Sequence, residues 1–235
     1  MKKAFQPKSG LEKFGFFIYE RLVENFPRTY FVGGTVRDFL LGNKITDIDI
    51  ATSATPSQSA EILKKYFIEC NLGYQAMGVV IATGKPYAAT VATFRKDLKS
   101  VSRYPKIKFV KSPKEDSIRR DFTINSLYFS PKTNKIFDFH GGLADLKKKR
   151  IKFIGQAEKR IKEDPLRILR AMRFALNLNF QLDPRAKKII KKSFALTKQL
   201  TNNKIKNEMN KLKNLPLKKI VNSIISNPKL LDRYF

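Results

Sequence analysis

Two aspartates, Asp47 and Asp49, stand one residue apart in the run Asp47-Ile48-Asp49-Ile50. Charged and apolar residues alternate in this run, which is typical of a strand with one buried face. Because successive side chains of a strand point to opposite faces, we expect both carboxylates on one face, about 7 Å apart along the backbone. Carboxylate oxygens are the ligands that Mg²⁺ prefers. The pair therefore predicts a site for a divalent cation.

Two glycines, Gly33 and Gly34, lie between a strand-like run at residues 30–32 and a helical segment that Gly42 ends. Glycine lets the backbone come close to an anion, and the free N–H groups at a helix start point at that anion. We call Gly33 and Gly34 the phosphate cradle. Arg37 follows one turn later, so the sequence predicts that these three residues bind phosphate groups.

Neither feature is specific alone, because a Gly-Gly pair usually forms a turn and an Asp-x-Asp pair is usually solvated. Together they meet the needs of nucleotidyl transfer, in which Mg²⁺ bridges a triphosphate and activates an attacking hydroxyl. The pattern resembles the signature of the bacterial-type (class II) tRNA nucleotidyltransferase (CCA-adding) and poly(A) polymerase family. The residues that carry the resemblance are Gly33, Gly34, Arg37, Asp38, Asp47 and Asp49. It implies that Asp47 and Asp49 are catalytic and bind Mg²⁺.

A second group of charges lies in residues 119–125, Arg-Arg-Asp-Phe-Thr-Ile-Asn. In isolation it would be read as surface charge. Adjacent arginines can reach triphosphate oxygens, and a neighbouring acid can accept a hydrogen bond from a ribose hydroxyl. The string resembles the ribose-recognition motif of the same family, which implies that Arg120 and Asp121 bind the nucleotide.

A third group, Asp164, Arg167, Arg170 and Arg173, repeats every third residue along a predicted helix. We expect Asp164 to cap this helix and an apolar stripe to face the core, formed by Leu166, Leu169, Met172 and Leu176. An ordinary capped helix with an arginine face would look the same.

A carboxylate and a guanidinium one turn apart would select cytosine and adenine, which both present an amine beside a ring acceptor. The segment resembles the nucleotide-templating motif of the family. This implies that Asp164 and Arg167 read the base and that Arg170 and Arg173 bind phosphates.

The elements around these residues predict an α+β fold: a nucleotidyltransferase head with a small mixed sheet and helices, followed by an all-helical neck. We place the head at residues 1–154 and the neck, with an abbreviated C-terminal region, at residues 155–235. Two predicted helices cover residues 11–26 and 57–65. A third begins with a capping box at residues 112–115, and a fourth begins at residues 141–143. The predicted strands are residues 79–83, 88–94 and 107–110, with a hairpin of residues 127–129 and 135–139.

Residues 95–106 predict a mobile loop, which a solvated connection would also explain. In the family, the loop after a Thr-Phe-Arg strand end is a flexible lever that helps the site to change its nucleotide preference. Thr93-Phe94-Arg95, with Arg103 and Pro105 further on, resembles that loop. Its presence argues against the CC-adding subtype.

Thr90 departs from the family pattern, because the aligned position usually carries a glutamate that is the third carboxylate of the metal site. Threonine cannot supply that charge. Either the two aspartates suffice, or Asp97 from the loop supplies the acid, or the protein is slow. We expect the aspartates to suffice, because a metal ion itself lowers the pKa of a bound hydroxyl.

The 235 residues carry 48 Lys and Arg against 20 Asp and Glu, a net charge of +28. Such an excess favours a nucleic-acid partner, although an AT-rich genome would also enrich lysine. A basic helix after residue 183 predicts RNA contacts at Lys187, Lys188, Lys191 and Lys192.

One cysteine and one histidine exclude an internal disulfide and a zinc site of the Cys/His type. No apolar run has membrane-spanning length and no secretory signal is evident, so we expect a cytoplasmic protein without a membrane partner.

The sequence thus predicts an enzyme that adds CCA to the 3′ end of tRNA from CTP and ATP, with Mg²⁺. The alternatives are a poly(A) polymerase, a partial A-adding enzyme, or a noncatalytic basic RNA-binding protein on the same head. Family members usually carry further helical body and tail regions, so we expect either an abbreviated enzyme or a fragment. The oligomeric state stays open.

Overall fold

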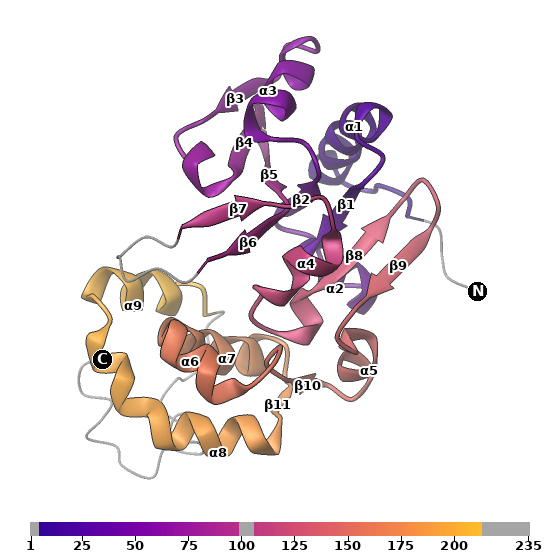
Figure 1. The fold of residues 1–235 in the computed structure, drawn as a ribbon. Coiled ribbons are helices and arrows are strands. Elements are labelled where there is room, and N and C mark those ends of the chain that lie inside the picture. Colours follow the sequence, from indigo (N-terminus) through magenta and orange to yellow (C-terminus); the bar gives the residue numbers. More distant parts are fainter. Residues whose placement is uncertain (1–4, 99–105, 213–235) are drawn as a thin grey trace. The chain divides into compact units, whose positions relative to one another are not determined.

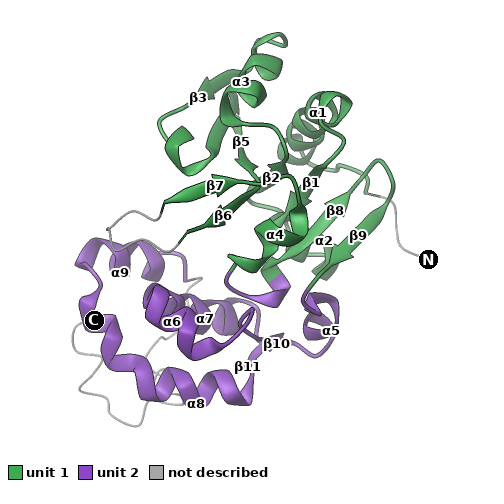
Figure 2. Ribbon diagram, viewed as in Figure 1, with its two compact units in different colours: residues 1–120, 125–139 green, residues 121–124, 140–235 purple. Residues whose placement is uncertain are grey.

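The structure of the protein is a computed structural model, and the residues described are 5–98 and 106–212 (Figure 1). The chain forms two compact units (Figure 2). Unit 1 consists of Met1–Arg120 and Asn125–Phe139. Unit 2 consists of Asp121–Ile124 and His140–Phe235. The chain therefore passes from unit 1 into unit 2, returns after four residues, and passes over again after Phe139.

A seven-stranded sheet forms the centre of unit 1, with the strand order β3-β4-β5-β2-β1-β8-β9. β2 and β5 are parallel and all other neighbours are antiparallel, so the sheet is mixed, as predicted. It is larger than the small sheet that we expected. Its strands are β1 (Thr29–Val32), β2 (Ile48–Thr52), β3 (Glu69–Asn71), β4 (Val79–Gly84), β5 (Tyr87–Thr93), β8 (Leu127–Ser130) and β9 (Lys135–Asp138).

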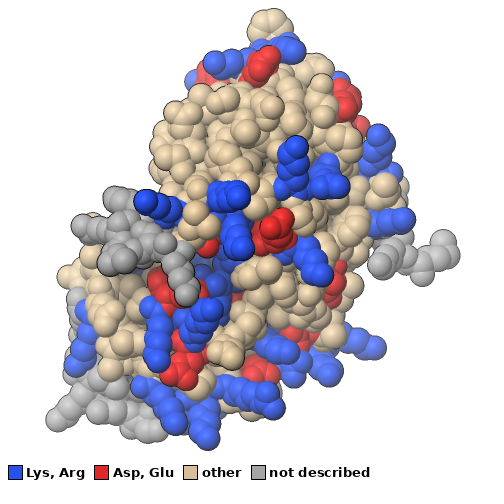
Figure 3. All heavy atoms as spheres, in the orientation of Figure 1, with Lys and Arg blue, Asp and Glu red and all other residues tan. Residues whose placement is uncertain are grey.

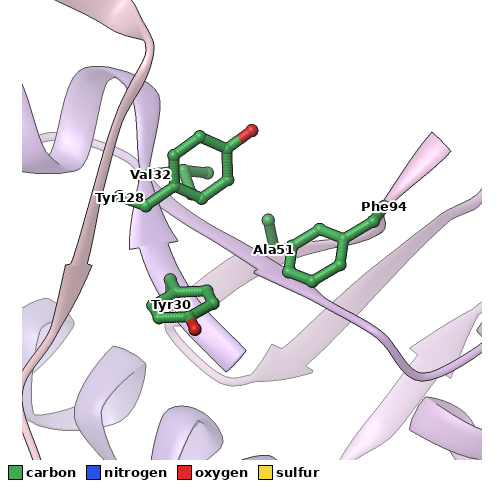
Figure 4. Packing of buried hydrophobic residues seen from close by; sticks show 5 residues of the cluster. All are labelled: Tyr30, Val32, Ala51, Phe94 and Tyr128. Atoms are coloured by element: carbon green, nitrogen blue, oxygen red, sulfur yellow. The ribbon is translucent and has the colours of Figure 1, made fainter. Parts of the chain in front are cut away.

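Helices α1 (Gly10–Asn25), α2 (Gly33–Leu41) and α3 (Pro56–Lys64) contact strands of this sheet. On β1, Phe31 stacks on Tyr19 of α1 with ring centroids 5.5 Å apart. Its neighbours on the strand face the other way and join the cluster of Tyr30, Val32, Ala51, Phe94 and Tyr128 (Figure 4). Both faces of the sheet are therefore buried along β1.

Several expected elements of unit 1 are confirmed. Residues 11–26 and 57–65 correspond to α1 and α3, and the hairpin corresponds to β8 and β9. The expected strands correspond to β4, β5 and β7 (Ile107–Phe109). The capping box at residues 112–115 was a wrong prediction: Ser112 precedes α4 (Pro113–Ile118), but its side chain makes no capping hydrogen bond. α4 is a short helix of six residues, whose first backbone hydrogen bond runs from the Asp116 N–H to the Ser112 carbonyl.

Part of the predicted loop at residues 95–106 is a strand. β6 (Arg95–Asp97) pairs with β7 in antiparallel register, Arg95 opposite Phe109 and Asp97 opposite Ile107. A three-residue strand is too short to show an alternating pattern in the sequence. Arg103 and Pro105 lie outside the described residues.

Unit 2 is mainly helical in its described part. Its helices are α5 (Gly142–Lys147), α6 (Ala157–Glu163), α7 (Leu166–Asn177), α8 (Pro184–Ser193), the 3-10 helix η3 (Phe194–Gln199) and α9 (Asn202–Met209). The expectation of helices alone after residue 155 was wrong, because β11 (Gln181–Leu182) pairs in parallel with β10 (Arg150–Ile151). Strands of two residues leave no periodic signal in the sequence.

The apolar stripe of α7 is confirmed. Leu169, Met172 and Leu176 are buried, and Leu166 packs half-buried against Leu200 and Ile205. α7 thereby contacts α9, while α6 packs on α8. Within residues 5–98 and 106–212, no helix is both long and apolar enough to cross a lipid bilayer.

Candidate nucleotide and metal site

The phosphate cradle and the Asp49 carboxylate lie together in unit 1. α2 begins at Gly33, whose φ of +65° lies in the left-handed region that favours glycine. A Cβ at Gly33 would stand 3.2 Å from Asp49 Oδ2 and 3.8 Å from Arg120 Nη1. Gly34 lies beside the same carboxylate: the place of a Cβ on Gly34 is 3.9 Å from Asp49 Oδ2, and the Gly34 backbone N–H lowers the pKa of Asp49. The start of α2 is therefore the place where the backbone, an acid and an arginine meet.

The two aspartates lie at the start of β2. Ile48 and Ile50 are buried, and a Cβ on Gly15 of α1 would lie within 3 Å of Ile48, so these isoleucines face α1. Asp49 lies on the opposite face, as the alternation predicted. Asp47 precedes the strand and is exposed.

Thr35 fixes the backbone of both aspartates. Its buried hydroxyl donates to the Asp47 carbonyl at 3.0 Å and accepts from the Asp49 N–H at 2.8 Å. Sequence reasoning missed this threonine, although its place two residues after Gly33 was a signal. Because Thr35 belongs to the same helix as the phosphate cradle, its two hydrogen bonds fix the distance between the cradle and the aspartates.

The charge state of Asp49 depends on its surroundings. Burial raises the pKa of Asp49, the nearby charge of Asp47 raises it further, and the charges of Arg120 and Arg37 lower it. Two carboxylates within electrostatic reach, one exposed and one half-buried, favour a bound cation, which removes their mutual repulsion.

The donor set fits Mg²⁺. Over the described ranges, no group of three or more His, Cys, Asp and Glu side chains stands together that could hold a metal. Mg²⁺ does not need such a group, since proteins usually hold it with one or two carboxylates, water and substrate phosphates. Asp47 and Asp49 offer these two carboxylates next to the phosphate cradle.

Thr90 is the direct neighbour of Asp49 on the next strand. In the parallel pair of β2 and β5, Asp49 is in register with Thr90. A side chain at position 90 therefore shares the sheet face of Asp49. Asp97, the alternative acid, lies on β6, where its carboxylate accepts from Arg95 Nε at 3.3 Å.

Arg37 is held by polar side chains near the start of α2. Its Nε and Nη2 donate to the Asp38 carboxylate at 3.0 and 2.7 Å, and its Nη1 donates to Asn125 Oδ1 at 2.8 Å. A Cβ on Gly34 would stand 3.6 Å from Arg37 Nη2. Arg37 thus lies beside the cradle, as predicted.

A buried acid, Asp116, organises the arginines that precede residue 121. Asp116 is fully buried and accepts from Arg119 Nε at 2.9 Å, Arg120 Nη2 at 3.1 Å, the Tyr128 hydroxyl at 2.6 Å and the Arg95 backbone N–H at 3.0 Å. We call these five residues the Asp116 cluster. Burial alone would raise the pKa of Asp116, but the charges of Arg120 and Arg119 and these hydrogen bonds outweigh it and lower the pKa to about 2.

Sequence reasoning missed Asp116 and Tyr128. The signal for Asp116 was its spacing, because it precedes Arg119 and Arg120 by three and four residues in a helical segment, where side chains meet. Tyr128 carried no such signal.

In unit 2, Asp121 is bound by Arg170. Its Oδ2 accepts from Arg170 Nε at 2.8 Å and Nη2 at 2.5 Å, and its Oδ1 accepts from the Phe122 N–H at 2.7 Å. The structure therefore pairs two of the residues that we assigned to nucleotide binding with each other.

The other two arginines of α7 also hold acids. Arg167 Nη1 donates to Glu163 at 2.9 Å and to the Arg160 carbonyl at 2.7 Å. Arg173 pairs with Glu208, which is buried. Glu163 precedes Arg167 by four residues, a spacing at which helical side chains meet, whereas no pattern in the sequence indicated Glu208.

Asp164 caps α7, as predicted. Its backbone is extended, and its Oδ1 accepts from the Leu166 N–H at 3.1 Å. Pro165, between Asp164 and the first residue of α7, already has helical φ and ψ, at a position where a helix tolerates the missing N–H of proline.

The four lysines of α8 are all exposed. They are Lys187, Lys188, Lys191 and Lys192. Figure 3 shows many Lys and Arg side chains on the face that it draws, among them those around the end of the molecule where Figure 1 labels α8.

Comparison with known proteins identifies the fold that carries this site. The model of the family described as "Poly A polymerase head domain" matches residues 29–152, more than half of the chain. The chain belongs to this family. The match covers the phosphate cradle, both aspartates and residues 119–125, and it confirms the expected family and the α+β head. Nucleotidyltransferases of this family generally use a divalent metal ion.

Relatives of this head domain include the CCA-adding enzyme of Lactococcus lactis subsp. lactis (strain IL1403), which is 42% identical over 170 residues, covering 71% of this chain and 42% of the relative. A crystal structure of the Bacillus stearothermophilus CCA-adding enzyme in complex with CTP superposes with a TM-score of 0.77 at 34% identity, over 87% of this chain and 49% of that one. A tRNA nucleotidyltransferase complexed with a primer tRNA and an incoming ATP analog has a TM-score of 0.71 at 28% identity, over 94% of this chain and 62% of that one. The chain spans about half the length of the curated relatives that it matches.

Proposed function

We propose that the chain catalyses the template-independent addition of CCA to the 3′ end of tRNA, with CTP and ATP as donors and Mg²⁺ as the metal ion. The observation that carries the proposal is the meeting of the Asp49 carboxylate, the Gly34 N–H and Arg120 at the start of α2. Support comes from relatives named CCA-adding enzymes and from solved structures that hold CTP, or a primer tRNA with an ATP analog.

In this proposal, unit 1 carries the chemistry. The 3′ oxygen of the RNA attacks the α-phosphorus, a phosphodiester bond forms, and the phosphoanhydride bond breaks to release pyrophosphate. The backbone N–H groups of Gly33 and Gly34, with Arg37 and Arg120, bind triphosphate oxygens. Asp47 and Asp49 hold Mg²⁺, which would withdraw charge from the phosphate and lower the pKa of the attacking hydroxyl.

Unit 2 selects the nucleotide and binds the RNA in the same proposal. Asp121 accepts from the ribose hydroxyl and is oriented by Arg170. Asp164 and Arg167 read the base, and Arg170 and Arg173 bind phosphates. The lysines of α8 follow the RNA backbone. We keep the division into a catalytic head at residues 1–154 and a base-selecting neck at residues 155–235, and a place in the cytoplasm, as parts of this proposal.

The experiment that tests the function compares the products from two substrates. The protein is incubated with tRNA that lacks CCA and with tRNA that ends in CC, under CTP, ATP or both, and the products are sequenced. We expect CCA on the first substrate only with both nucleotides, and a single A on the second with ATP alone.

The other outcomes separate the alternatives. Long A tracts would indicate a poly(A) polymerase, and addition only to the CC end would indicate a partial A-adding enzyme. Binding of tRNA without any product, under conditions in which a related CCA-adding enzyme is active, would indicate a noncatalytic RNA-binding protein.

A further inference from the structure

Arg120 is held along one edge of its guanidinium group. Its Nε donates to the Tyr128 hydroxyl at 2.9 Å and its Nη2 donates to Asp116 Oδ2 at 3.1 Å. Nη1 is the nitrogen turned toward the phosphate cradle, 3.8 Å from the place of a Cβ on Gly33. The group therefore has one edge on the Asp116 cluster and one nitrogen at the start of α2.

Asp116 and Tyr128 form a closed triangle with Arg120. The Tyr128 hydroxyl accepts from Arg120 Nε and donates to Asp116 Oδ2 at 2.6 Å, so each member contacts the other two. The guanidinium carbon also lies 5.0 Å from the centre of the Tyr128 ring. A guanidinium held in two directions by hydrogen bonds and by a ring face has little rotational freedom left.

The sheet fixes Tyr128 itself. Its ring is fully buried in the cluster with Tyr30, Val32, Ala51 and Phe94, and its hydroxyl points away from that cluster (Figure 4). Asp116 is equally buried. Both partners of Arg120 therefore stand on rigid parts of unit 1.

A second acid, Asp49, lies near Arg120 and could pair with it in place of Asp116. The charge of Arg120 acts on the Asp49 carboxylate, which is the proposed ligand of the metal ion. An arginine with free rotation would pair directly with that carboxylate and compete with the cation. A brace on the opposite edge of the guanidinium prevents this movement.

We propose that Asp116, with Tyr128, is a positioning residue that holds Arg120 for the triphosphate and keeps it from closing on Asp49. This inference rests on the proposed function, because it concerns how the same site binds the nucleotide. Asp116 touches neither the substrate nor the metal ion in this proposal and acts only through Arg120.

The test is a double-mutant cycle. Asp116→Asn keeps the size of the side chain and removes its charge, Tyr128→Phe removes only the hydroxyl, and Arg120→Ala removes the group that they hold. For each single variant and for the pairs with Arg120→Ala, we would measure the Kd for CTP, kcat and KM for addition to tRNA, and thermal unfolding.

We expect Asp116→Asn to weaken CTP binding and to lower kcat/KM by about ten- to a hundredfold, since a charge-assisted hydrogen bond to a buried partner is removed. Tyr128→Phe should cause a smaller loss of the same kind. In the Arg120→Ala background, both changes should leave the Kd and kcat/KM unaltered within about twofold.

Tyr19→Phe is the matched control. Tyr19 is also a buried tyrosine of unit 1, and its hydroxyl bonds with Ser130 at 3.2 Å and accepts from the Lys132 N–H at 3.3 Å. This variant should lose stability to a similar extent and keep its affinity for CTP.

Additive losses from Asp116→Asn and Arg120→Ala would overturn the positioning role, because Asp116 would then act independently of Arg120. So would an unchanged affinity in a folded Asp116→Asn protein. The two proposals fail separately: a wild-type chain that binds CTP but adds no nucleotide refutes the function, while the cycle on Kd still decides the role of Asp116. A wild-type chain that binds no CTP overturns both.

Discussion

Unit 1 and unit 2 hold their arginines in different ways. In unit 1, Arg119 and Arg120 share one fully buried acid, Asp116. In unit 2, each arginine of α7 pairs with a different acid, and the three acids come from separate segments of the chain. The pairs are Arg167 with Glu163, Arg170 with Asp121, and Arg173 with Glu208.

The difference has a physical consequence. A buried acid shared by several donors permits one arrangement, since removal of any partner leaves charge without compensation. Separate pairs can be exchanged one at a time, because a ligand that takes one arginine leaves the others in place. We therefore expect substitutions in unit 1 to change the rate of nucleotide addition, and substitutions in unit 2 to change which nucleotide is chosen. The predictions below test that division.

The largest effect is expected in unit 1. Asp49→Ala or Asp47→Ala should lower nucleotide addition by roughly a thousandfold or more, because the charge stabilisation at the reacting phosphate is removed. Single-turnover kinetics with Mg²⁺ measure the rate, and thermal unfolding shows that the fold remains. The preference of the residual activity for CTP and ATP should not change. Near-full turnover in either variant would remove the aspartates from the mechanism.

In unit 2, substitutions should change the choice of base. Asp164→Ala and Arg167→Ala should let UTP or GTP compete with CTP and ATP, since removal of a bidentate hydrogen-bonded pair costs ~1–3 kcal/mol of discrimination, roughly ten- to a hundredfold. Competition assays with mixed nucleotides measure the preference.

Arg160→Ala is the control for Arg167→Ala, because Arg160 also pairs with Glu163, at 2.6 Å, and has no proposed role in reading the base. If the Asp164 and Arg167 variants are slower but keep the wild-type preference, α7 is a structural helix and the division between the units fails.

A substitution of Thr90, the neighbour of Asp49 on β5, should change the rate of nucleotide addition by a smaller factor, and should raise it. Thr90→Glu should raise the rate at neutral pH by about tenfold, because it adds a carboxylate in register with Asp49. This is below the ~10²–10⁴-fold that a positioned general base typically adds. Thr90→Gln matches its size without the charge and should give no gain. Asp97→Ala should have little effect. A collapse in Asp97→Ala without a gain in Thr90→Glu would mean that Asp97 supplies the acid.

The smallest effect concerns RNA affinity. Replacement of Lys187, Lys188, Lys191 and Lys192 by alanine should flatten the dependence of log Kd on log salt, by up to about 0.7–0.9 for each phosphate that is no longer neutralised. A titration of tRNA at several salt concentrations measures the slope. Four exposed lysines of unit 1, Lys64, Lys65, Lys85 and Lys132, are the control set. An equal slope in both variants would place the RNA away from α8.

Local patterns in the sequence predicted what depends on local structure. The alternation around Asp49 and the stripe of α7 follow from the period of a strand and of a helix, and the two glycines mark the start of α2; the structure has all three. The two-residue strands β10 and β11 left no period to find.

Partners that are distant in the chain could not be predicted in the same way. Arg170 and Asp121 are 49 residues apart, and Arg173 and Glu208 are 35 apart. A helical period tells which face an arginine lies on, but it does not tell which acid meets that face. In the sequence, Glu208 is the single acid of residues 185–219, and its pairing with Arg173 follows from the packing of α9 on α7.

The four residues Asp121–Ile124 couple the unfolding of unit 2 to that of unit 1, because they belong to unit 2 and are flanked on both sides by residues of unit 1. They belong to unit 2, where the Thr123 N–H donates to the Lys152 carbonyl and the Ile154 N–H donates to the Asp121 carbonyl, but both ends of the segment continue into unit 1. If unit 2 opened alone, it would release a short strap that unit 1 still holds at both ends, and its backbone groups would lose their partners. The amides of Thr123 and Ile154 should therefore exchange with solvent deuterium only through openings that break this strap, which makes them reporters of cooperative opening of the two units.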